Sequence, residues 1–210
     1  MGDHHDQKDH GNRLKKTEQD FYQNLASETT SVLDRIYGKL VSGVVAKGRQ
    51  ETPQNTQKRQ VLVIVGLEAT KKEKLEKDVL MMLGRLKRLE IPPVVLSYAL
   101  GLLCRVSKKL EIGVEKSTCS RTTLKYLLLS AVLISSKMLM EDRSRKVAEI
   151  AGLFKYEVSR LIETEKRLVI EYLEFNLYIS YVDLVREVKF FAKNEFFEFL
   201  KSDLFQAVSA

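Results

Sequence analysis

The side chains that enzymes use most often for catalysis are scarce in this sequence. The three histidines, His4, His5 and His10, all lie near the N-terminus, and the two cysteines, Cys104 and Cys119, lack a Cys-x-x-Cys spacing. Imidazole is the commonest general base and a frequent zinc ligand. We therefore expect no enzyme, no metal site, no cofactor and no small-molecule substrate.

The longest apolar stretch runs from Leu124 to Met140 and is interrupted by Lys125 and, near its end, by Lys137. The last carbonyls of a helix lack intrahelical partners, so a lysine there can donate to its own helix or to a partner's backbone. The stretch is uncharged only from Tyr126 to Ser136, well short of the roughly 20 residues that a membrane span needs. We expect a buried helix and no membrane partner.

The composition is that of a globular protein. The 210 residues are 44% hydrophobic and 30% charged, with a net charge of +7. A basic domain can bind nucleic acid, but the lysines alternate with glutamates, as in residues 71–77. Such alternation is typical first of a solvated helix face with paired charges. Nucleic acid is therefore the less favoured partner.

The positions of proline and the apolar spacing predict an all-α chain. Proline occurs only at Pro53, Pro92 and Pro93, and apolar residues elsewhere recur at helical spacing. The predicted order is a disordered arm over 1–13, a helix over 14–46, a linker over 47–59, a helical domain over 60–180 and a helical extension over 181–210. Within the domain we expect helices near 60–66, 74–89, 93–109, 120–140, 145–153 and 156–172.

Three stretches in the second half of the chain resemble, in order, the motifs of a cyclin box. They are Ser130 to Asp142 (SAVLISSKMLMED), Ala148 to Phe154 (AEIAGLF) and Phe175 to Ser180 (FNLYIS). Upstream, Ile91 to Arg105 resembles the helix that begins at proline in this family. The match is closest to the P/U-type, phosphate-pathway-like cyclins.

The resemblance implies a single five-helix cyclin box with additional N-terminal and C-terminal helices. It implies an intracellular regulatory subunit that binds and activates a cyclin-dependent protein kinase, in cell-cycle or nutrient-linked control. The residues that it places at the kinase interface are Lys137, Met138, Glu165, Phe175 and Leu177. By spacing alone, Met138, Phe175 and Leu177 could equally be ordinary core residues.

Two departures from the family pattern leave alternatives open. Counting back from Phe175 without a gap places Lys166 where the family has a glutamate, with Glu165 one residue away, or about 100° around a helix. Cys104 stands where the family has aspartate. The alternative function is a single-box nucleic-acid-binding or transcription-related module.

Overall fold

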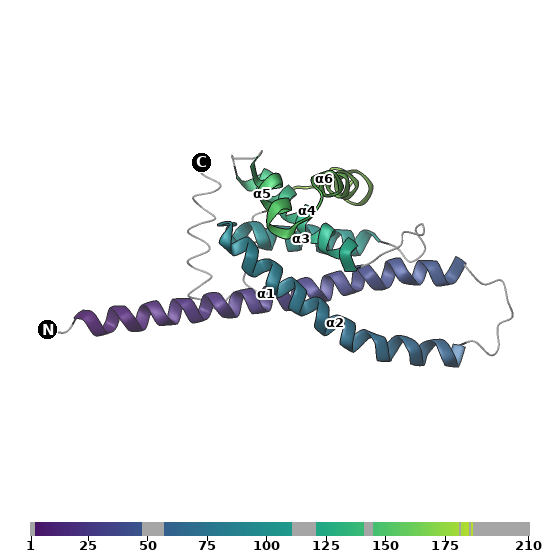
Figure 1. Cartoon of the computed structure of the whole chain (residues 1–210), viewed down its shortest axis with the longest axis horizontal. Coiled ribbons are helices and arrows are strands. Elements are labelled where there is room, and N and C mark those ends of the chain that lie inside the picture. Colours follow the sequence, from purple (N-terminus) through teal and green to yellow (C-terminus); the bar gives the residue numbers. More distant parts are fainter. Residues whose placement is uncertain are drawn as a thin grey trace.

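The computed structural model describes the backbone of residues 3–47, 57–110, 121–140, 145–180, 182–184 and 186. These residues are mostly helical and include no strand, which confirms the all-α prediction. In chain order the elements are α1 (Asp3–Lys47), α2 (Gln57–Arg88), α3 (Pro93–Lys109), α4 (Arg121–Leu139), α5 (Arg145–Phe154), α6 (Val158–Arg167) and the π-helical turn η1 (Leu168–Tyr172). Figure 1 shows α1 and α2 as two long helices that cross, with the shorter α3 to α6 stacked on one side of them.

The N-terminal helix is longer than the sequence predicts. Residues 1–13 are expected to form a disordered arm, but α1 begins at Asp3 and continues without a break to Lys47. Extending an existing helix gains one hydrogen bond for each residue that becomes ordered, so polar residues can continue it. Helix therefore replaces the predicted arm from Asp3 onward.

Helix α2 also joins elements that the sequence separates. The sequence predicts that residues 57–59 belong to the linker and residues 60–66 to a short helix of their own, but α2 runs unbroken from Gln57 to Arg88. Its β-branched residues and Gly66 lower helix propensity by only about 1 kcal/mol or less each, which does not end a helix. Residues 48–56 of the linker and most of the predicted extension lie outside the described residues.

The break between α2 and α3 lies where the two prolines predict it. After Arg88 the backbone of Glu90 turns to a φ of 55°, and the amide of Ile91 donates to the carbonyl of Leu86 at 3.3 Å. This is a Schellman cap, which commonly precedes proline. Pro92 then precedes the first turn of α3, where Pro93 has no amide hydrogen to leave unpaired.

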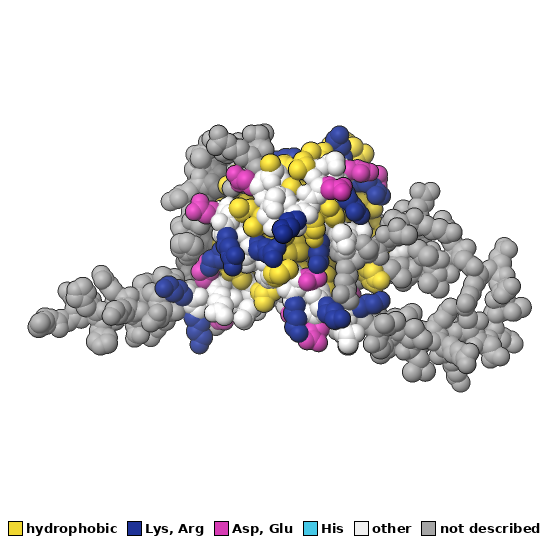
Figure 2. All heavy atoms as spheres, viewed as in Figure 1, with side chains coloured by type: hydrophobic (Ala, Val, Ile, Leu, Met, Phe, Trp, Pro, Cys, Tyr) yellow, Lys and Arg dark blue, Asp and Glu magenta, His cyan; other side chains and the backbone are white. Residues whose placement is uncertain are grey.

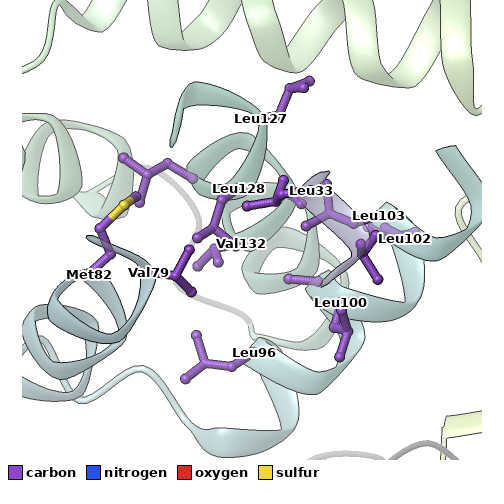
Figure 3. Close-up of a cluster of buried hydrophobic side chains, with 14 of the residues drawn as sticks. Leu33, Val79, Met82, Leu96, Leu100, Leu102, Leu103, Leu127, Leu128 and Val132 are labelled. Carbon is purple, nitrogen blue, oxygen red and sulfur yellow. The ribbon is translucent and has the colours of Figure 1, made fainter. Parts of the chain in front are cut away.

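One hydrophobic core holds the helices together, and α4 lies inside it. Every residue from Tyr126 to Ser136 is buried, so this helix is covered on nearly all sides, as its apolar sequence predicts. Figure 3 shows buried side chains of α1, α2, α3 and α4 gathered in one cluster, among them Leu33, Met82, Leu103 and Val132. Fully burying one such side chain contributes about 2 kcal/mol.

Helix α1 is part of this core. Phe21, Leu25 and Leu33 are 0% exposed because they pack against α2 and α3. The ammonium of Lys39 donates to the carbonyl of Ser107 on α3 at 2.6 Å, which adds a polar contact to the same interface. The apolar stripe of α1 is therefore covered within the chain.

Candidate partner-binding site

The structure brings together two residues that the resemblance selects. Lys137, in the last turn of α4, forms an ion pair with Glu165 of α6. The side chain of Lys137 is 37% exposed and that of Glu165 is 13% exposed. Because an ammonium carries three hydrogens, this pair leaves Lys137 with donors for a further acceptor.

The π-helical turn explains why Glu165, and not Lys166, faces Lys137. In η1 the amide of Leu173 donates to the carbonyl of Leu168, five residues earlier, at 2.9 Å. A π-turn holds one residue more than an α-turn. The count back from Phe175 therefore shifts by one residue, from Lys166 to Glu165, and Lys166 is exposed.

Three buried leucines give the physical reason for the wider turn. Leu161 and Leu168 are each 0% exposed and lie two α-helical turns apart, so they share one face. Leu173 is 1% exposed, yet a regular α-helix would turn Tyr172 inward in its place. Widening the turn by one residue brings Leu173 onto the buried face.

Met138, next to Lys137, is 43% exposed, and Ile162, one turn before Glu165 on α6, is 37% exposed. Apolar side chains beside a partly exposed charge pair are typical of protein interfaces, whose anchors are apolar and whose rim is polar. The alternative that Met138 is a core residue is wrong. The sequence does not indicate Ile162, because helical spacing alone does not distinguish an exposed isoleucine from a buried one.

The other two candidates lie on the segment that follows η1, which we call the strap (residues 174–180). Phe175 is 71% exposed and so is not a core residue, whereas Leu177 is half-buried and packs against the core. The backbone at Glu174 and Phe175 is left-handed, with φ values of 48° and 60°. This conformation is uncommon for a bulky residue such as phenylalanine.

Tyr98 of α3 anchors the strap. Its hydroxyl donates to the carbonyl of Leu177 at 2.8 Å and accepts from the amide of Ile179 at 3.0 Å. Tyr98 is 3% exposed, so both hydrogen bonds are shielded from water. One side chain thus satisfies two backbone groups that have no helical partner.

The same face of α3 holds the rest of the strap. Arg105 donates to the backbone and side-chain oxygens of Asn176 at 3.1 and 3.2 Å, and Lys109 pairs with Glu174 at 2.7 Å. Tyr98, Arg105 and Lys109 recur at helical spacing, so they line one stripe of α3. That spacing is visible in the sequence, but it does not indicate which segment the stripe holds.

The candidates form two groups. Lys137, Met138 and Glu165 lie together, while Phe175 and Leu177 lie on the strap. Within the described part of the chain, no hydrogen bond or ion pair joins the two groups directly. They are connected through η1, which packs against both α3 and α4.

The sequence predicts no metal site, and the structure describes only some of the side chains that could form one. His4, His5 and His10 belong to the part of α1 whose side chains are not described. Among the side chains that are described, no three His, Cys, Asp or Glu residues gather as metal ligands. The absence of a cofactor stays a prediction.

Helix α4 also passes a simple test for a membrane span. Its window Thr122–Leu139 has 18 residues and a mean hydropathy of 1.2. However, 67% of that window is buried inside the fold, and it contains Lys125 and Lys137. A core helix of a globular protein passes the same test.

Comparisons with protein-family models, with curated proteins and with solved structures gave no match for this chain.

Proposed function

We propose that this chain is a cyclin-type regulatory subunit that binds and activates a cyclin-dependent protein kinase. The observation that carries the proposal is the convergence of Lys137 and Glu165. The resemblance selects Lys137 from its first motif and Glu165, beside the position given by the ungapped count, as a candidate for the family glutamate, and the two residues are 28 positions apart in the chain. Their meeting is expected of a cyclin box and is not required by an all-α fold in general.

The physical role of the pair follows from where it lies. Lys137 has hydrogens left to donate to a backbone carbonyl of the kinase, and Glu165 can accept from a backbone amide close to that carbonyl, so the pair contacts backbone groups that flank the mobile helix of the kinase. Holding that helix in place would complete the Lys–Glu ion pair on which kinase catalysis depends. The chain itself then needs no catalytic group.

The exposed apolar residues supply the contact area for the same partner. Met138 and Ile162 lie near the charge pair, and Phe175 projects from the strap. Methionine adapts its shape to an irregular pocket, and aromatic residues are frequent anchors at interfaces. In this proposal α2 to α6 with η1 constitute the box, and α1 is the additional N-terminal helix that packs on it.

The test is affinity purification of the full chain from its native cell, followed by identification of the bound proteins and reconstitution of the pair. We expect a cyclin-dependent kinase to be recovered and its activity to rise when the purified chain is added. Recovery of no such kinase, or of one that the chain leaves inactive, would contradict the proposal.

A further inference from the structure

A second group of side chains lies where α2, α4, α5 and α6 meet, near the opposite end of α4 from Lys137. We call it the basic-aromatic cluster, and its members are Arg85, Lys125, Tyr126, Phe154, Tyr156 and Arg160. Three of these side chains are cationic and three are aromatic. None of them has a role in the proposed kinase contact.

The aromatic rings form a fixed base for the cluster. The rings of Tyr126 and Tyr156 stack with centroids 4.6 Å apart, and those of Phe154 and Tyr156 stack at 6.1 Å. Tyr126 is 4% exposed and Phe154 is 8% exposed, so packing restricts both rings. Side chains that lie on these rings are therefore held with little freedom.

Two arginines lie over this base. The guanidinium carbon of Arg160 is 4.9 Å from the centroid of the Tyr126 ring, and that of Arg85 is 5.8 Å from the Phe154 ring. A guanidinium that rests on a ring keeps N–H groups along its edge for an anion. Among the described residues, neither guanidinium has a hydrogen bond or a carboxylate partner.

The neighbouring charges leave the cluster positive. Lys125 pairs with Asp78 at 2.7 Å, which neutralises one of the three cations. Burial raises the pKa of Tyr156, and the charges of Lys125, Asp78 and Arg85 also act on this phenol. The hydroxyl of Tyr156 therefore stays protonated at neutral pH, as a donor close to these groups.

The turn that presents Tyr156 is conformationally restricted. After α5 the backbone of Lys155 has a φ of 55°, and the amide of Tyr156 donates to the carbonyl of Ala151 at 2.9 Å. Glycine or asparagine usually takes the left-handed position of this cap. Here a lysine takes it, which adds an exposed cation, while Glu157 adds an exposed carboxylate.

From this arrangement we propose that the basic-aromatic cluster binds a peptide segment of a protein partner that carries phosphoserine or phosphothreonine among acidic residues. Arginine forks match phosphate and carboxylate oxygens in pairs, and arginine clusters are a recurring means of recognising such segments. Arg85 and Arg160 donate to the phosphate and to a neighbouring carboxylate, and Tyr156 adds a hydroxyl donor.

A peptide suits this surface better than a nucleic acid does. Nucleic-acid affinity depends on many phosphate contacts along a continuous basic track. The cluster has three cations, and one of them, Lys125, is already paired with Asp78. Figure 2 shows basic side chains interspersed with apolar and uncharged ones on the face in view. The proposal does not depend on kinase binding, because the cluster is built on other residues.

The experiment measures binding of fluorescent peptide libraries to the full-length protein by anisotropy. One library has a fixed central phosphothreonine among acidic residues, a second has threonine there, and mixed-sequence single-stranded DNA and RNA are the further probes. The variants are Arg85→Gln and Arg160→Gln. Arg88→Gln is the matched control, because it removes the same charge from an exposed position in the last turn of α2.

We expect the phosphorylated library to bind, Arg85→Gln and Arg160→Gln each to weaken binding about tenfold, and Arg88→Gln to leave it unchanged. If a glutamine variant melts at a lower temperature than the parent, the lysine variant of that position replaces it. Lysine keeps the charge without the fork, so it should weaken binding too. Equal loss in all three glutamine variants, equal binding of both libraries, or tighter binding of nucleic acid through the same arginines would overturn the proposal.

Discussion

Glu165 is the more buried partner of Lys137, with 13% of its side chain exposed against 37% for the lysine. The carboxylate is therefore held between α4 and α6, while the ammonium reaches the surface. Such a pair adds little to folding, because ion pairs that water can reach contribute about 1 kcal/mol or less. The pair instead fixes the positions of the Lys137 ammonium and the Glu165 carboxylate, as a binding surface for a partner requires.

Reversing the pair should separate stability from partner binding. Lys137→Glu alone places two carboxylates together, so we expect the free energy of unfolding to fall by about 1 kcal/mol. Adding Glu165→Lys should restore it, because opposite charges again face each other. Urea denaturation measures both steps. Kinase binding should stay lost in the double variant, since donor and acceptor have exchanged places. Recovered binding would show that only the fold depends on the pair.

Removing one residue from η1 should be tolerated. Ile170 is 54% exposed, and its deletion turns the π-turn into a regular α-turn that still carries Leu161, Leu168 and Leu173 on one face. We expect the melting temperature to stay within a few degrees of the parent, as for a surface change of about 0.5 kcal/mol or less. Deletion of Glu163, an exposed residue in the middle of α6, is the control. It rotates Leu161 by about 100° relative to Leu168 and should be destabilising. Equal loss in both deletions would contradict this explanation of the register.

The hydroxyl of Tyr98 should contribute measurably to stability. Tyr98→Phe leaves the buried amide of Ile179 and the carbonyl of Leu177 without their partner, so we expect a loss of about 1 to 3 kcal/mol. Tyr178→Phe is the control, since Tyr178 is 70% exposed. Chemical denaturation compares the two variants. A loss of the same size in both would mean that the hydroxyl of Tyr98 does not hold the strap.

Ser136 offers a stabilising substitution next to the proposed contact. It is 3% exposed, and its hydroxyl has no hydrogen-bond partner among the described residues. An unpaired buried hydroxyl is unfavourable, so Ser136→Ala should raise the free energy of unfolding by about 1 kcal/mol. Ser135→Ala is the matched control, because its hydroxyl donates to the carbonyl of Ala131 at 2.8 Å. An equal response of the two variants in thermal unfolding would contradict this difference.

The parts of the fold that depend on local sequence could be predicted. Pro92 and Pro93 mark the start of α3 because proline restricts the backbone wherever it stands. The apolar residues on all sides of α4 predict its central place, because a helix without a polar face must be covered by its neighbours. The prediction of a separate helix at residues 60–66 is wrong, because the β-branched residues there lower helix propensity only slightly and α2 continues through them.

The candidate site depended more on tertiary structure. Lys137 is selected by the resemblance of residues 130–142 to a family motif, and its position near the end of an apolar helix is visible in the sequence. The choice between Glu165 and Lys166 could not be made, because it depends on Leu173 being buried together with Leu168. The hydrogen bond from the amide of Ile179 to the hydroxyl of Tyr98 could not be predicted either, since 81 positions separate the two residues.

The most direct test of the proposed function is activation of the recovered kinase by the parent chain, Lys137→Ala and Lys166→Ala. Lys166 is the control because it is an exposed lysine one residue from Glu165. For Lys137→Ala we expect the concentration that gives half-maximal kinase activation to rise at least tenfold, while the melting temperature stays close to that of the parent. Lys166→Ala should activate like the parent. Full activation by Lys137→Ala, or an equal loss in both variants, would contradict the assignment of Lys137 and Glu165 as the kinase contact.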